Sequence, residues 1–396
     1  MIGLGRTERH FLANWWWTVD RWLLLGILSL MGLGFIMSFA ASPAIAQKLE
    51  INTYHFAYRQ IAFLSLSLVV MIICSLFDPQ HLRRWVMAAG VLALGGVVMS
   101  LVVGLEIKGS TRWLHVMGFS IQPSEFLKPC FVVAIAWCFA LQNTRFNVPG
   151  RLLAFLLLAV VCGLLAMQPD IGQMILLACV WGGMFFLAGG SYAVIALLAF
   201  IGIATALVLY HSFAHVRGRV DRFLDPSSGD TFQTDKALEA FQNGGLIGTG
   251  PGDGRIKHAL PDAHTDYVFA VAAEEFGLLV GLLIIGIFAL IIIRALLRLY
   301  ESKDHWTQLA GSGLIMLFGL QTIINISVNL NLMPPKGMTL PFISYGGSSL
   351  LALALTMGML LSLTRRGTQM KRILPEPPAP VSIDGAACAV VSGRAI

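Results

Sequence analysis

The chain has 396 residues, of which 57% are hydrophobic and only 12% are charged, and its mean hydropathy is +0.76. A soluble domain of this length does not have such a composition, so we predict a membrane protein. The net charge of +6 comes from basic residues scattered between apolar runs, which argues against a nucleic-acid partner. The six cysteines form no C-x-x-C pair, so we predict neither a cysteine metal site nor a disulfide framework.

The first 21 residues are polar and rich in tryptophan, with Trp15, Trp16 and Trp17 in a row. We predict that 1–21 form an amphipathic cytoplasmic leader at the membrane surface. The apolar run 22–41 is followed by Ala44-Ile45-Ala46, which imitates a signal-peptidase site. At about 20 residues this run is longer than the apolar core of a signal peptide, and further spans follow it, so we interpret it as a membrane anchor.

Ten apolar runs are long enough, at about 20 residues or somewhat less, to cross a bilayer. They lie at 22–41, 56–76, 85–105, 124–141, 152–168, 171–188, 191–211, 266–298, 306–331 and 340–363. The predicted fold class is therefore an all-α polytopic membrane protein with ten transmembrane helices, occupying 22–364. An even number of spans puts both termini on one side, and the arginine and lysine distribution makes that side cytoplasmic. Residues 365–396, rich in Pro and Ala, are predicted to be a disordered cytoplasmic tail.

Two connections are unusual. The first, 211–265 between spans seven and eight, is predicted to be a large periplasmic loop with an amphipathic helix within 216–241. The glycine-rich stretch 244–254 within it follows no strand, so we expect a flexible lid and not a nucleotide-binding loop. The second, within 325–349 between spans nine and ten, carries polar and glycine residues into apolar surroundings. Irregular backbone at that depth must line a cavity, so we predict a re-entrant loop there, with Lys336 as a cation in the cavity.

Ionisable residues at the start of span eight are the strongest candidates for chemistry. Asp266 stands beside His264 at the mouth of the span, and Glu274 lies about 12 Å further down a helix, too far for the paired carboxylates of retaining glycosidases. A lone carboxylate suits a general base acting on one hydroxyl, and the alternative is that Asp266 caps its helix. Glu274 and Glu275 are predicted to hold helices together. Glu125 and Lys128, spaced i, i+3, fit either ligand binding or an intrahelical ion pair.

Three stretches resemble the signature motifs of the SEDS family (shape, elongation, division and sporulation) of integral-membrane peptidoglycan glycosyltransferases. They are 106–128, 261–266 and 335–341. The Lys336-Gly337 pair is similar to the division branch of the family, whereas the elongation branch tends to have Thr-Gly. The Trp-Trp-Trp-Thr-Val-Asp-Arg leader looks like the alphaproteobacterial branch. Ala237 and Tyr267 depart from the family pattern, so roles within the large loop are not carried over.

The resemblance implies a polymerase of lipid II, a disaccharide-pentapeptide on undecaprenyl pyrophosphate, in the inner membrane at the division septum. Asp266 would deprotonate the 4-hydroxyl of the acceptor sugar for an inverting attack, and cations would take up the charge on the departing pyrophosphate. The substrate contacts that we predict are Arg59, Glu125, Lys128, Lys257, His264, Lys336, Ser344 and Tyr345. No cofactor is predicted with certainty, and a divalent cation (Mg²⁺ or Mn²⁺) with Asp266 as its ligand is left open.

The implied partners are a class B penicillin-binding transpeptidase and other membrane proteins of the divisome. Two other functions fit the sequence. A lipid II flippase or transporter would also have ten spans with buried charges and broken helices. A divisome scaffold without catalysis would have no need of Asp266.

Overall fold

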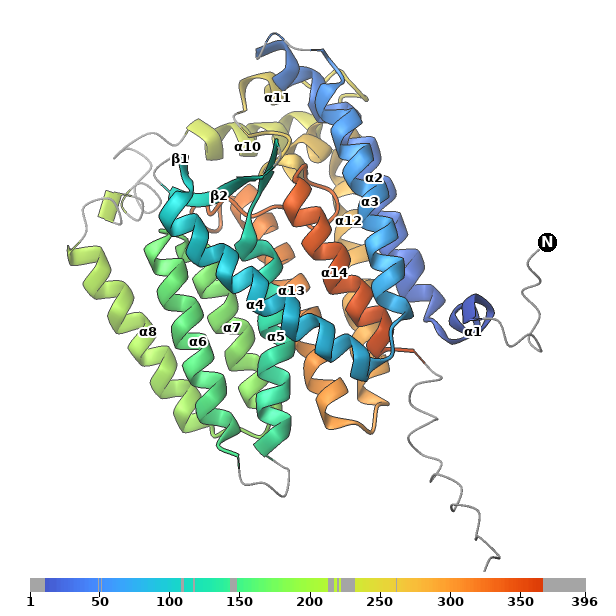
Figure 1. Cartoon of the computed structure of the whole chain (residues 1–396). Coiled ribbons are helices and arrows are strands. Elements are labelled where there is room, and N and C mark those ends of the chain that lie inside the picture. The colour runs from blue at the N-terminus through green and yellow to red at the C-terminus, as the bar shows by residue number, and fades with distance from the viewer. Residues whose placement is uncertain are drawn as a thin grey trace, which may run out of the picture.

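The computed structural model describes residues 11–48, 50, 52–107, 110–116, 118–142, 148–212, 217–218, 221, 232–260 and 262–365. Residues 1–10 of the predicted leader, 366–396 of the predicted tail and most of 213–231 in the large loop lie outside this range. Figure 1 shows a helical bundle, and the helices of the described part are α1 (Phe11–Thr18), α2 (Arg21–Lys48), α3 (His55–Leu76), α4 (Pro79–Val103), α5 (Pro123–Gln142), α6 (Gly150–Met167), α7 (Ile171–Leu187), α8 (Tyr192–Ser212), α10 (Phe232–Gly244), α11 (Ile256–Ala259), α12 (Val268–Tyr300), α13 (His305–Asn329) and α14 (Gly347–Leu363).

Eight of the described helices are long and apolar enough to cross a membrane: α2, α3, α4, α5, α6, α8, α12 and α13. Two shorter apolar helices, α7 and α14, have 17 residues each. These helices coincide with the ten predicted runs, because in lipid an apolar segment satisfies its backbone groups by forming a helix. A polytopic membrane protein is thus confirmed, and the count of ten crossings stays a prediction.

A small β-sheet corrects the prediction of an all-α chain. Between α4 and α5 the chain forms β1 (Leu105–Ile107), β2 (Ser110–Val116) and β3 (Phe119–Ile121), which pair antiparallel in the order β1-β2-β3. The connection is too short to span the membrane and folds back on itself instead. Ser348, at the start of α14, anchors it, since Ser348 Oγ accepts from Gln122 N (3.1 Å) and donates to Ser120 O (3.3 Å).

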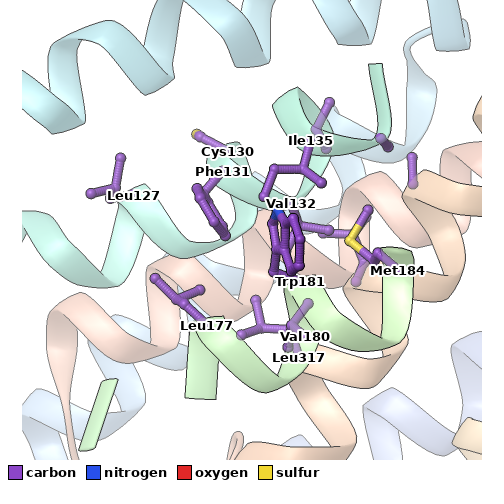
Figure 2. Close-up of a cluster of buried hydrophobic side chains, with 14 of the residues drawn as sticks. Leu127, Cys130, Phe131, Val132, Ile135, Leu177, Val180, Trp181, Met184 and Leu317 are labelled. Carbon is purple, nitrogen blue, oxygen red and sulfur yellow. The ribbon is translucent and has the colours of Figure 1, made fainter. Parts of the chain in front are cut away.

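The interior is packed around two helices that are buried on most sides. One cluster surrounds α5, where Phe131 and Val132 face residues of α7 and α13 (Figure 2). Trp181 of α7 stacks on Phe185 with ring centroids 5.1 Å apart, and its indole donates to Ala154 O of α6 (3.0 Å). The second cluster joins α2, α3, α12, α13 and α14. By contrast α8 lies at the margin of the bundle in Figure 1, and its apolar side chains are mostly exposed.

Both ends of the described chain meet at one end of the bundle, which we call the terminal end. Arg365, just after α14, donates to Thr18 Oγ1 at the end of α1 (3.0 Å). Nearby, Asp20 forms ion pairs with Arg294 and Arg298 of α12. This meeting agrees with an even number of spans. The opposite end, which carries α10, α11 and the β-sheet (Figure 1), is called the loop end.

The segment 330–346 between α13 and α14 is irregular and packs into the protein. Met338, Leu340 and Phe342 of this segment are buried. Helix α2 passes so close that a β-carbon on Gly34 would lie 2.0 Å from Phe342 O, so only glycine fits there. The irregular backbone expected between spans nine and ten is therefore present and enclosed by helices. Its depth in the bilayer stays a prediction.

Candidate active site

Asp266 lies in a series of turns, 262–267, that leads into α12. Its N–H donates to Asp262 O (3.2 Å), and its side chain is half-buried. Tyr267 occupies the N-cap position of α12, so Asp266 stands one residue before the place at which a carboxylate caps a helix. Burial raises the pKa of Tyr267 to about 12, and the carboxylates of Asp266 and Asp262 add to the shift. This position favours a role for the Asp266 carboxylate other than helix capping.

Two asparagines of α13 hold the backbone of Asp266. Asn325 Nδ2 and Asn329 Nδ2 both donate to Asp266 O, each at 2.9 Å. Asn329 Oδ1 also accepts from Ala270 N in the first turn of α12 (3.1 Å). Both asparagines are almost fully buried, with exposures of 1% and 0%. Sequence reasoning assigned them no role, although polar residues at i and i+4 on an apolar helix are a signal that could have found them.

The same amide of Asn325 joins Asp266 to the irregular segment. Asn325 Nδ2 donates to Met338 O (2.6 Å), two residues after Lys336. A β-carbon placed on Gly337, whose φ is 65°, would lie 3.8 Å from Asp266 Oδ2. The predicted carboxylate and the turn that carries the predicted cation Lys336 are thus neighbours, although they are 70 positions apart in the sequence. The Lys336 side chain is half-buried.

A group of aromatic rings lies beside Asp266. The ring centroid of His264 is 5.0 Å from that of Phe56 and 5.4 Å from that of Tyr345. Tyr345 N donates to His264 O (2.9 Å), which ties the irregular segment to the turns before α12. The exposed Arg59 of α3 also acts here: burial raises the pKa of Tyr345, and the Arg59 charge opposes that rise. Met37 lines a small pocket together with these three rings. Arg59, His264 and Tyr345 are therefore brought together as predicted site residues.

A buried polar network extends from this region into the bundle. Lys128 Nζ bonds Glu125 (2.9 Å) and Gln321 Oε1 (3.3 Å), and Gln173 Nε2 donates to Glu125 Oε1 (2.9 Å). Gln321 Nε2 in turn donates to Thr339 O of the irregular segment (3.1 Å). Of the two alternatives for Glu125 and Lys128, the structure shows the ion pair. Their contact with substrate stays a prediction.

Asp170, which the sequence reasoning did not single out, continues this network between α6 and α7. Its carboxylate accepts from Gln173 N (3.3 Å) as the cap of α7 and pairs with Arg112 of β2 (3.4 Å). Burial raises the pKa of Asp170, while the Arg112 guanidinium opposes the shift. A carboxylate between two apolar helices was the available signal. Gly172, next in the chain, packs against the backbone of Lys336, so the network reaches the Lys336 turn from a second side.

Two predicted substrate contacts have structural partners instead. Lys257 is buried, and its ammonium bonds Glu275, Gly252 O (3.0 Å) and Ala40 O (3.2 Å). Ser344 is also buried, and its hydroxyl accepts from Leu340 N (2.8 Å). Because these groups are occupied within the protein, we now interpret both as residues that shape the site.

Within the described residues no three His, Cys, Asp or Glu side chains are grouped to hold a metal ion. A divalent cation at Asp266 would thus take most of its ligands from water and substrate oxygens, as Mg²⁺ commonly does. The assembled site consists of one half-buried carboxylate, a lysine on the adjoining turn and a rim of His264, Tyr345 and Arg59. Such a site suits proton removal next to a negatively charged leaving group.

Comparisons with known proteins agree with this arrangement. A model of the FtsW/RodA/SpoVE family, described as "Cell cycle protein", matches residues 21–369. The chain is 45% identical over 366 residues to a probable peptidoglycan glycosyltransferase FtsW from Caulobacter vibrioides, covering 91% of this chain and 93% of that protein. It is 35% identical over 362 residues to the protein of the same name from Coxiella burnetii, covering 87% and 96%.

Solved structures show the same fold. A chain from a peptidoglycan synthase complex in which polymerization and crosslinking are coordinated aligns with a TM-score of 0.72 and 25% identity, over 87% of this chain and 97% of that chain. The rod shape determining protein RodA of Thermus thermophilus aligns with a TM-score of 0.66 and 25% identity, over 88% and 97%. With a family model that covers most of the chain and relatives matched over nearly their full length, this protein belongs to the FtsW/RodA/SpoVE family.

Proposed function

We propose that this protein, a peptidoglycan glycosyltransferase of its family, polymerises lipid II into glycan strands and that Asp266 is the general base. The observation that carries the proposal is the meeting of Asp266 with the Lys336-Gly337 turn, joined through the single side chain of Asn325. The names of the relatives support the class of reaction. The role of Asp266 is argued from its position.

In the proposed reaction the Asp266 carboxylate takes the proton of the acceptor sugar's 4-hydroxyl. The hydroxyl oxygen then forms a bond to the anomeric carbon of the donor with inversion, while the bond from that carbon to the pyrophosphate breaks. The electron pair leaves with undecaprenyl pyrophosphate. Pyrophosphate needs no protein acid to depart, so the chemistry requires one base and nearby positive charge.

Lys336 and Arg59 are the proposed cations for the pyrophosphate. Lys336 lies on the turn beside Asp266, and Arg59 is exposed at the edge of the aromatic group. Neither residue has a salt bridge of the kind that occupies Lys128 and Lys257. If a Mg²⁺ or Mn²⁺ ion assists, we propose that Asp266 contributes one ligand and the pyrophosphate oxygens contribute others.

We propose that the protein acts in the inner membrane at the division septum, with both termini in the cytoplasm and the loop end facing the periplasm. The charge distribution supports this orientation. The partner we propose is a class B penicillin-binding transpeptidase, because one structural neighbour comes from a synthase complex. A lipid flippase and a scaffold remain the rival functions. Neither requires a carboxylate and a lysine at one site.

The test is polymerisation of lipid II by purified protein with its cognate transpeptidase, comparing wild type with Asp266→Asn. Asparagine keeps the shape of the side chain but is not a base, so we expect the rate to fall by about 10²–10⁴-fold. Asp253→Asn is the matched control, since Asp253 is an exposed carboxylate of the same loop and its variant should keep wild-type turnover.

Expression, membrane insertion and transpeptidase binding of the Asp266→Asn protein should be unchanged. An Asp266→Asn protein that polymerises lipid II within about threefold of wild type would remove Asp266 from catalysis. A wild-type protein that moves lipid II across vesicles but makes no polymer would favour the flippase.

A further inference from the structure

Helix α12 is broken near its loop end. Gly277 has φ 80° and ψ 177°, values that no α-helix contains. In an unbroken helix the N–H groups of Leu278 and Leu279 would pair with the carbonyls of Glu274 and Glu275, four residues earlier. The break separates these groups and leaves two donors and two acceptors to be satisfied by something else.

The glycine-rich stretch that follows α10 fills the break. Thr249 N and Gly250 N donate to the carbonyls of Glu274 (2.9 Å) and Glu275 (3.0 Å). On the other side, Leu278 N donates to Gly245 O (3.0 Å) and Leu279 N donates to Leu246 O (3.3 Å). The segment 244–250, which we call the inserted loop, therefore replaces the two missing helical hydrogen bonds with four of its own. This stretch is thus fixed by hydrogen bonds and is not the flexible lid expected from its sequence.

Glycine is required where the inserted loop touches the helix. A β-carbon on Gly277 would lie 2.4 Å from Leu246 O, and one on Gly248 would lie 2.3 Å from Glu275 O. One on Gly244 would lie 2.0 Å from Ala273 O. Real side chains cannot approach backbone atoms this closely. The glycines therefore permit a close fit of loop against helix, which is a use of glycine unrelated to flexibility.

The position of the break along α12 places it at membrane depth. Between Glu275 and Arg294 the helix has 18 residues, 276–293, without a charged side chain. At 1.5 Å per residue they span about 27 Å, no more than the hydrocarbon core of about 30 Å. Arg294 is held at the terminal end by its ion pair with Asp20. All of the run is needed to cross the core, so Leu278 and Leu279 reach its boundary at the loop end.

Two large apolar side chains of the inserted loop point outward at this level. Leu246 is 66% exposed and Ile247 is 82% exposed. They lie next to Leu278 and Leu279 of α12, which are themselves exposed and continue into the apolar face of the helix at Leu282. This face of a membrane-crossing helix contacts lipid. The two loop residues therefore extend a lipid-facing surface.

The loop on either side of the tip is held in the protein by the glutamates. Glu274 accepts from the backbone N–H groups of Arg255 (2.7 Å), Ile256 (2.7 Å) and Lys257 (3.1 Å), and Glu275 accepts from Gly252 N (3.1 Å). The prediction that these glutamates join parts of the protein agrees with these bonds. Only the tip is left to face outward.

We propose that the inserted loop is a membrane anchor: Leu246 and Ile247 enter the acyl chains of the leaflet at the loop end, and the backbone between them closes the break in α12. Non-helical backbone is tolerated at this depth because every freed group of the break has a partner. The large loop is thereby attached both to lipid and to the helix that begins beside Asp266. This proposal does not depend on the reaction assigned above.

The test is the depth of a spin label at residue 247. In full-length protein whose six native cysteines are alanine, Ile247→Cys is labelled and reconstituted in liposomes of phosphatidylcholine and phosphatidylglycerol. Collision with oxygen, which concentrates in lipid, is compared with collision with a water-soluble nickel chelate. A label at Leu282 is the lipid-facing reference, and a label at the exposed Gln242 of α10 is the aqueous reference.

We expect the label at 247 to behave like that at 282, with oxygen access exceeding nickel access. Nickel access that matches position 242 would overturn the proposal, and so would exclusion of both reagents, which would indicate a protein partner or a second copy over the tip. If Ile247→Cys does not fold, Leu246→Cys gives the same test.

A second measurement examines the fit in the break. Gly277→Ala should displace the inserted loop, moving the label at 247 toward nickel access and lowering the Tm. Gly286→Ala is the control on the same helix, because a β-carbon there meets nothing within 4 Å. A Gly277→Ala protein with an unchanged label signal would show that the break does not hold the loop.

Discussion

Replacement of Asn325 by alanine tests whether the site depends on the cradle beneath it. The amide of this buried side chain donates to Asp266 O and to Met338 O, and so connects the two segments of the site. After Asn325→Ala, Asp266 O keeps the donor from Asn329, but Met338 O loses its only side-chain donor among the bonds described above. A buried acceptor without a donor costs about 1–3 kcal/mol, and the lost bond to Asp266 O about 1 kcal/mol more.

We therefore expect Asn325→Ala to lower the free energy of unfolding by about 2–4 kcal/mol. The effect on turnover has a separate origin. Once the Met338 carbonyl is free, the turn that carries Lys336 can shift relative to Asp266, and a misplacement of about 1 Å can cost about 10²-fold in rate. We expect kcat to fall by about 10- to 100-fold per folded molecule, with a smaller change in KM.

The assay is polymerisation of lipid II at several substrate concentrations, together with thermal unfolding in the same detergent. Thr322→Val is the matched control, because Thr322 is buried one turn earlier on α13 and its hydroxyl bonds Phe318 O within the same helix (2.9 Å). This variant should keep wild-type kcat. If Asn325→Ala lost stability but kept kcat, or if the control lost kcat equally, Asn325 would not position the site.

Three further substitutions follow from the contacts. Lys336→Ala should slow polymerisation by about 2–4 kcal/mol of barrier with little change in Tm, as measured by turnover and thermal unfolding, because the lysine is half-buried on the site turn. Lys128→Ala should lower Tm as well as turnover, since it leaves the buried Glu125 charge without its cation, and an unchanged Tm would contradict the pairing. Burial alone would raise the pKa of Asp20, but hydrogen bonds from two arginines of α12 outweigh it and leave the pKa lowered. The stability from Asp20 should thus be present above pH ~4 and be lost as the pH falls through the lowered pKa, so the Tm difference between wild type and Asp20→Asn should shrink in acid.

Much of the architecture is readable from local sequence. An apolar run of sufficient length must form a helix in lipid, so the positions of the membrane helices followed from composition alone. Asp266 could be singled out for the same reason, because a carboxylate at the edge of such a run is costly and needs a function. The irregular segment before α14 was also evident, since its polar and glycine residues interrupt an apolar stretch.

Partners distant in the sequence were decided only by the tertiary structure. The motif around Lys128 and Glu125 allowed either a ligand site or an ion pair, and the packing of α5 against α7 and α13 produced the pair. Lys257 looked available for substrate until its burial against Glu275 and α2 was known. A charge is free or occupied according to what surrounds it, and the surroundings come from other helices.

The glycine-rich stretch shows the limit most clearly. Its composition indicates an easily deformed backbone, which is equally compatible with a mobile lid and with a close fit against another backbone. Which of the two occurs depends on the break at Gly277, about 30 positions later, whose free N–H and carbonyl groups match those of the loop. Local sequence determined that this backbone could approach another closely, and only the folded chain supplied the backbone that it meets.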